Sequence, residues 1–142
     1  MLASLSSIIS EWVEAKCTFL GKPGKLPANI ILVDILIDSD FLTWPLSANF
    51  YGNRYANNLT KIEFNEDWSG KSIEYDGKRY KTYRDHLHFG SDYSDILTFT
   101  DIYDQLLNAP ANIQLNMLAQ FKKDPEDYLH KAERLIKEVH MV

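Results

Sequence analysis

Two histidines in the middle of the chain are the residues best suited to chemistry. His86 and His88 lie in the run Arg84-Asp85-His86-Leu87-His88. In a β-strand their side chains would project from the same face about 7 Å apart, because side chains alternate and each residue advances about 3.3 Å. Two imidazoles placed in this way can ligate zinc or a related metal, and they can also act as acid and base on a phosphoester. The pair is short, and no later residues extend it into a known metallohydrolase signature.

A carboxylate would have to complete such a metal site. Asp92, Asp95 and Asp34 are the candidates. The resulting alternative function is a metal-dependent phosphoesterase or nuclease that uses His86 and His88 with Asp34 or Asp92. Asp34 also has a structural interpretation, because a carboxylate within an apolar run must be paired, hydrogen-bonded or protonated if it is buried. The pattern favours pairing of Asp34 with a Lys, Arg or Tyr over a catalytic or metal role.

Other catalytic and cofactor motifs are missing from the sequence. Its glycines do not assemble into a phosphate-binding loop or a dinucleotide fingerprint, and no serine occupies a Gly-x-Ser-x-Gly elbow. Cys17 is the only cysteine, lies in an amphipathic segment and can form no intrachain disulfide. We therefore predict no catalytic nucleophile and no cofactor.

The acidic residues are distributed unevenly. The formal net charge is −5, and residues 85–121 contain five carboxylates and not one Lys or Arg. This acidic window consists of Asp85, Asp92, Asp95, Asp101 and Asp104. Such a zone repels phosphate backbones and attracts basic partners. The charge pattern makes direct nucleic-acid binding unlikely and favours a basic protein partner.

Aromatic residues provide possible anchors for a partner. Tyr and Trp combine an apolar body with a polar tip, which suits both cores and contact surfaces. Trp44 and Tyr51 lie in residues 38–58, which form either a binding loop or a short helix, and Tyr93 lies among the acidic residues.

Together these features predict a small acidic protein-binding module. It would be an inhibitor or immunity-type antagonist that occludes the active site of a basic enzyme such as a nuclease. The predicted contact residues are Asp92, Asp95, Asp101 and Asp104, with Trp44, Tyr51 and Tyr93 as anchors.

A β-hairpin is the clearest local structure in the sequence. Asp76-Gly77 separates two alternating segments within residues 71–83, and an Asp-Gly pair suits the type I′ turn of a two-residue hairpin loop. This loop fixes the register, so the expected cross-strand pairs are Tyr75 with Lys78, Glu74 with Arg79, Ile73 with Tyr80 and Ser72 with Lys81. Further strands are predicted at 29–38, 60–64 and 96–100 from their β-branched and aromatic content.

Helices are predicted at both ends of the chain. Residues 2–20 have apolar side chains at helical spacing and end at Gly21 and Pro23. A short helix is expected over 101–108 with Ile102 directed inward, and Asp124-Pro125 is the clearest helix start.

The predicted fold is a single α+β domain spanning residues 1–142. It has an N-terminal helix, a mainly antiparallel sheet of about five strands and C-terminal helices packed on one sheet face. The N-terminal residues lack a basic leader, and no run approaches the roughly 18 apolar residues of a membrane span. We therefore expect a cytoplasmic protein.

Overall fold

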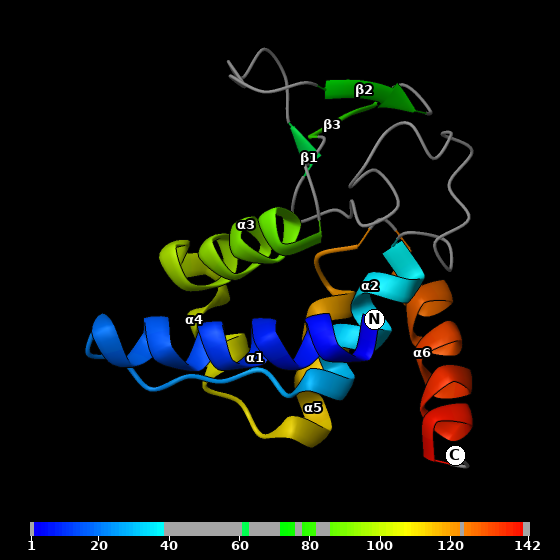
Figure 1. Ribbon diagram of the computed structural model, residues 1–142. Coiled ribbons are helices and arrows are strands. Elements are labelled where there is room, and N and C mark those ends of the chain that lie inside the picture. Colours follow the sequence, from blue (N-terminus) through cyan, green and yellow to red (C-terminus); the bar gives the residue numbers. More distant parts are fainter. Residues whose placement is uncertain are drawn as a thin grey trace.

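The computed structural model describes residues 2–38, 61–62, 72–75, 78–81, 86–122 and 124–140. These residues form six α-helices, a 3-10 helix and three short strands (Figure 1). The helices are α1 (Leu2–Phe19), α2 (Ala28–Asp38), α3 (His86–Phe99), η2 (Asp101–Tyr103), α4 (Asp104–Leu107), α5 (Ala111–Ala119) and α6 (Pro125–His140). The strands are β1 (Lys61–Ile62), β2 (Ser72–Tyr75) and β3 (Lys78–Lys81). The chain is predominantly helical, so the predicted α+β fold with a sheet of about five strands is wrong.

The predicted N-terminal helix is confirmed as α1. Its buried face carries Leu5, Ile9, Val13 and Cys17 at a spacing of four residues, which keeps them on one side of the helix. Gly21 ends the helix with φ 71°, a left-handed conformation that glycine adopts without steric cost. The N–H of Lys22 then donates to the carbonyl of Cys17 at 3.0 Å, which closes the last turn.

Burial of Cys17 gives the protein a testable pH dependence. Desolvation raises the pKa of this thiol above its ordinary value of 9.0, the Asp104 carboxylate adds to the increase, and the Lys22 ammonium opposes it. Below about pH 9 the thiol is protonated in both states, whereas at higher pH the unfolded chain ionises first. We expect the free energy of unfolding to fall as pH rises through the folded pKa, relative to a Cys17→Ala variant. Urea unfolding in reductant between pH 7 and 10 would check this, and parallel pH profiles would contradict it.

Helix α2 occupies the segment that was predicted to be a strand. Ile30, Ile31, Val33 and Ile35 are all buried, so the helix is covered on most of its circumference. A helix that is apolar all round shows no 3.6-residue pattern, and its many β-branched residues resemble a buried strand. Packing against α1 and α6 overrides the strand propensity of this sequence.

Helix α3 contains the two histidines for which a strand geometry was considered, together with most of the strand predicted at 96–100. Phe89, Tyr93 and Leu97 are each 0% exposed and lie four residues apart, as expected for the buried face of a helix. Gly90 is inside the helix, where a Cβ atom would lie 3.1 Å from both Ile9 Cγ1 and Leu5 Cδ1. Gly90 therefore lets α3 approach α1 closely.

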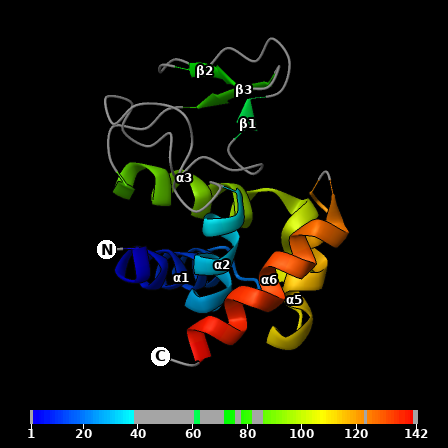
Figure 2. The same ribbon diagram turned by 90° about the vertical axis from the view of Figure 1, so that its right-hand side faces the viewer.

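The C-terminal helices complete the helical core. Asp124 caps α6 by accepting a hydrogen bond from the N–H of Asp127 at 3.1 Å, and Pro125 occupies the first helical position. Both features confirm the predicted helix start. Helix α6 packs on α2 and α5 (Figure 2), where Ala132 and Leu135 contact Val33. No helix in the described ranges is long and apolar enough to cross a membrane.

The described strands form one antiparallel sheet in the order β1-β3-β2. The pairs between β2 and β3 are Ser72 with Lys81, Ile73 with Tyr80, Glu74 with Arg79 and Tyr75 with Lys78, which is the register expected from a two-residue loop. The loop itself, Asp76-Gly77, lies outside the described residues. In both views the strands lie on the α3 side of the helices, so the predicted packing of the C-terminal helices on a sheet face is also wrong.

Candidate functional site

The acidic window gains basic neighbours when the chain folds. Helix α1 runs parallel to α3, so that its C-terminal half lies beside the carboxylates. Lys16 Nζ lies 2.6 Å from Asp95 Oδ1, and Lys22 Nζ lies 2.6 Å from Asp104 Oδ1. The window contains no basic residue along the sequence, but in the folded chain Lys16 and Lys22 neutralise part of its negative charge.

Each lysine is held by additional acceptors. Lys16 Nζ donates to Ser94 Oγ at 2.5 Å, and Lys22 Nζ donates to the carbonyl of Thr98 at 2.7 Å. The carboxylates of Asp95 and Asp104 remain about half exposed, so each ion pair contributes at most about 1 kcal/mol to stability. Asp101 is exposed, and in the described part of the chain no cation forms an ion pair with it. Asp92 is partly buried.

Large apolar side chains are exposed near these acidic residues. Phe19 is 86% exposed, Ile102 is 62% exposed and Phe99 is 55% exposed, and Leu20 is also exposed. The two ion pairs hold residues 16–22, the end of α1 and the turn after it, against residues 95–104, and the C-terminal ends of α1 and α3 lie together (Figure 1). We call Phe19, Leu20, Phe99 and Ile102 the apolar end. Such a group of exposed apolar residues is typical of an interaction site.

Sequence reasoning missed the apolar end. Ile102 was expected to point inward, and its exposure shows that this prediction is wrong. Phe19 lies next to the Gly21 turn and Phe99 lies in the last turn of α3, where a helix leaves its buried stripe. The position of each phenylalanine in the last turn of its helix was the sequence feature that could have indicated its exposure.

Tyr93 lies in the core and has no exposed surface for a partner. Its ring is 0% exposed and packs against Phe89, with ring centroids 5.7 Å apart. Its hydroxyl donates a 2.7 Å hydrogen bond to Asp34 Oδ2. The role predicted for Tyr93 as a partner anchor is therefore replaced by a structural one.

Asp34 is the centre of a buried polar cluster that joins four segments of the chain. The carboxylate is 0% exposed, and its Oδ1 accepts a 2.7 Å hydrogen bond from the Tyr128 hydroxyl and lies 2.9 Å from Lys122 Nζ. The Lys122 ammonium also lies 5.2 Å from the centroid of the Tyr128 ring. The predicted pairing of Asp34 with a Lys or Tyr is confirmed, although Asp34 lies on a helix. With its oxygens occupied in the core, Asp34 is unsuited to ligate a catalytic metal.

The two histidines lie on a helix and not on a strand. His86 is the first residue of α3, and His88 follows two residues later. His88 and Asp92 are four residues apart and share a face, but the described residues contain no group of three His, Cys, Asp or Glu side chains able to hold a metal. The predicted metal and acid–base pair therefore lacks the strand geometry on which it depended. Trp44 and Tyr51 lie outside the described residues, and their role stays a prediction.

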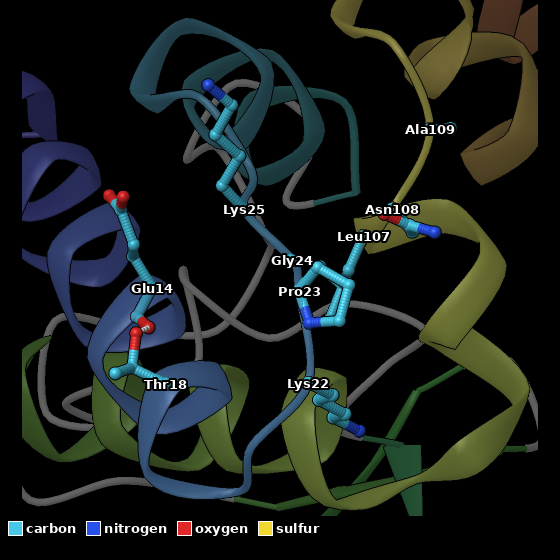
Figure 3. Close-up of a pocket in the computed structure, with 9 residues that line it drawn as sticks. All are labelled: Glu14, Thr18, Lys22, Pro23, Gly24, Lys25, Leu107, Asn108 and Ala109. Carbon is cyan, nitrogen blue, oxygen red and sulfur yellow. Dashed lines mark hydrogen bonds between the residues drawn. The ribbon is translucent and has the colours of Figure 1, made fainter.

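A groove of about 360 Å³ lies between α1 and the turn that follows α4 (Figure 3). Glu14 and Thr18 form one wall, residues 22–25 form the floor, and residues 107–109 form the opposite wall. Lys22 lines this groove and is also the residue that pairs with Asp104, so the groove adjoins the acidic residues.

The described surface carries two distinctive features: the apolar end with its neighbouring carboxylates, and the groove that adjoins them. Neither a protein-family model, nor a curated protein, nor a solved structure matches this chain.

Proposed function

We propose that this protein is a small acidic protein-binding module that blocks the active site of a basic enzyme such as a nuclease. The observation that carries the proposal is the apolar end, of which Phe99 and Ile102 lie within a few residues of Asp95, Asp101 and Asp104 in the chain. Protein interfaces commonly combine a central apolar or aromatic anchor with a polar rim. The apolar end would supply the anchor, and the carboxylates would supply the rim.

Charge complementarity supports a basic partner. The chain carries a formal net charge of −5, and Asp101 adds an exposed carboxylate that no described cation neutralises. A negative rim accelerates encounter with a positively charged cleft, such as one that binds nucleic acid. Asp92, Asp95, Asp101 and Asp104 would cover that cleft, and Trp44 and Tyr51 remain proposed anchors.

The ion pairs of Asp95 and Asp104 suit a pre-organised surface. Lys16 and Lys22 fix both carboxylates against α1 before any partner arrives. A surface that is already ordered loses less conformational entropy on binding. Asp101 is then the carboxylate with the greatest freedom to pair with a lysine or arginine of the partner.

Affinity capture from an extract of the native cells tests this proposal. We expect the wild-type protein to retain a basic enzyme, and Phe19→Ala or Ile102→Ala to weaken this complex by about 2 kcal/mol, roughly thirtyfold in Kd. Asp101→Lys should slow association at low salt and weaken its dependence on ionic strength. Isothermal titration and stopped-flow kinetics with the captured enzyme would measure the two effects.

Matched controls exist on the far helices. Ile113→Ala removes an exposed isoleucine from α5, and Glu133→Lys reverses an exposed charge on α6. Neither control should change binding by more than about twofold. If Phe19→Ala, Ile102→Ala and Asp101→Lys bind the enzyme as tightly as the two control variants do, the apolar end is excluded as the binding surface.

A further inference from the structure

Half of the apolar end lies on a short segment whose own side chains do not hold it in place. Residues 99–102 join the last turn of α3 to η2 and carry Phe99 and Ile102. None of these four side chains is buried, so the hydrophobic effect, the main force that orders a chain, does not fix them. Tyr103, the next residue, is buried and packs against Phe121 with ring centroids 4.8 Å apart. The segment is therefore fixed through its flanks.

A single ammonium group connects the two flanks of this segment. Lys22 Nζ donates to the carbonyl of Thr98, just before the segment, at 2.7 Å, and to Asp104 Oδ1, just after it, at 2.6 Å. Thr98 lies in the last turn of α3, where carbonyls have no acceptor role within the helix and favour a nearby cation. Lys22 thus bridges the end of α3 and the first residue of α4.

Lys22 is itself anchored to the end of α1. Its N–H donates to the carbonyl of Cys17 at 3.0 Å, directly after the left-handed Gly21. Phe19 and Leu20, the other half of the apolar end, precede this turn by one and two residues. The bridge therefore fixes the segment that carries Phe99 and Ile102 relative to the end of α1.

Lys16 makes contacts of the same strength without bridging anything. Its ammonium donates to Ser94 Oγ at 2.5 Å and to Asp95 Oδ1 at 2.6 Å, and both acceptors lie within α3, before residue 99. The side chains of Lys16 and Lys22 are equally exposed, at 24%. Lys16 is therefore a control that matches Lys22 in charge and in exposure.

We propose that Lys22 is a positioning residue that holds the two halves of the apolar end in one arrangement before a partner binds. The inference rests on the proposed function for the use of this surface, whereas the order of residues 99–102 is a property of the free protein. A surface that is ordered in advance loses less conformational entropy on binding. If Lys22 acted only through its charge, its removal would instead strengthen the attraction of a basic partner. The two roles therefore predict opposite effects on affinity.

NMR relaxation of the full, ¹⁵N-labelled chain tests the inference without a partner. We expect Lys22→Met to lower the backbone order parameters of residues 99–102 from about 0.85 to below about 0.6. Lys16→Met should leave them unchanged, and Lys22→Arg should preserve them, because a guanidinium group can donate to both acceptors. All three variants should stay folded, since a partly exposed ion pair contributes little to stability. Unchanged order in Lys22→Met would overturn the inference.

Binding to the captured enzyme tests whether this order matters for function. Lys22→Met should dissociate about tenfold faster than the wild type, although the substitution makes the protein more negative. Lys16→Met should change the dissociation rate by less than about twofold and should not slow association. Tighter binding by Lys22→Met than by the wild type would indicate a role through charge alone and would overturn the inference.

The two tests separate this inference from the proposed function. If Ile102→Ala binds the enzyme as tightly as the wild type while Lys22→Met loses order in residues 99–102, the proposed surface is wrong. That result would still support Lys22 as the residue that orders this segment.

Discussion

Replacing Asp34 with asparagine is expected to lower the free energy of unfolding by about 3–5 kcal/mol. The substitution removes the negative charge that lies 2.9 Å from the Lys122 ammonium, in a pair whose side chains are only 3% and 0% exposed. It also replaces one of the two carboxylate oxygens that accept from the Tyr93 and Tyr128 hydroxyls with an amide NH2 group, which can only donate, so one hydroxyl loses its acceptor. Urea denaturation followed by tryptophan fluorescence would measure the loss.

A double substitution separates the charge from the packing. Lys122→Met alone should also destabilise the protein, because it leaves the Asp34 carboxylate buried without its cation. The Asp34→Asn, Lys122→Met protein should be markedly more stable than the sum of the two single losses predicts. Simple additivity would mean that the ion pair does not couple α2 to the α5–α6 connection.

The second large effect is expected at Gly24. A Cβ atom at this position would lie 2.8 Å from Cys17 Sγ and 3.1 Å from Leu107 Cβ, which is closer than nonbonded atoms tolerate. Gly24→Ala should therefore destabilise the protein by about 2 kcal/mol, since overpacking of a filled core costs about 1–3 kcal/mol. Thermal or urea denaturation in reductant would measure the loss.

Cys17 provides the matched test of this steric explanation. Cys17→Ala removes the sulfur atom that the new methyl group would meet, so Gly24→Ala should cost much less in a Cys17→Ala background than in the wild type. An equal cost in both backgrounds would assign the effect of Gly24→Ala to the backbone or to Leu107 instead.

Local signals in the sequence were sufficient for the elements with clear ends. The Gly21 turn, the Asp124 cap and the cross-strand pairs of β2 and β3 all follow from chemistry within a few residues. The pairing of Asp34 was also predictable, because a carboxylate within an apolar run has few alternatives to a buried partner. Its particular partners were not, since Tyr93 and Lys122 come from distant parts of the chain.

The wrong fold class has an identifiable physical origin in α2 and α3. Burial on most sides removes the helical pattern from α2, and Gly90 with the neighbouring Ser91 and Asp92 resembles a turn in α3. The spacing of Phe89, Tyr93 and Leu97 was the contrary signal, because three apolar residues four apart indicate a helix. Tertiary packing of Gly90 on α1 decides between the two interpretations.

The candidate surface depends on which helices lie side by side, and the sequence does not contain this directly. The acidic window is free of Lys and Arg along the chain, yet α1 and the turn after it bring Lys16 and Lys22 against the window. Exposure of Ile102 likewise follows from where η2 begins after α3 rather than from its own hydrophobicity. The acidic character of the surface was predictable, whereas the apolar end was not.

Inhibition of the captured enzyme by the purified protein tests the central claim most directly. The enzyme retained by affinity capture would be assayed on its own substrate with increasing amounts of the full chain, at low and at high salt. The proposed function predicts complete inhibition at one equivalent, weaker inhibition at high salt, and weaker inhibition by Ile102→Ala but not by Ile113→Ala. Full enzyme activity in a saturated complex would contradict it.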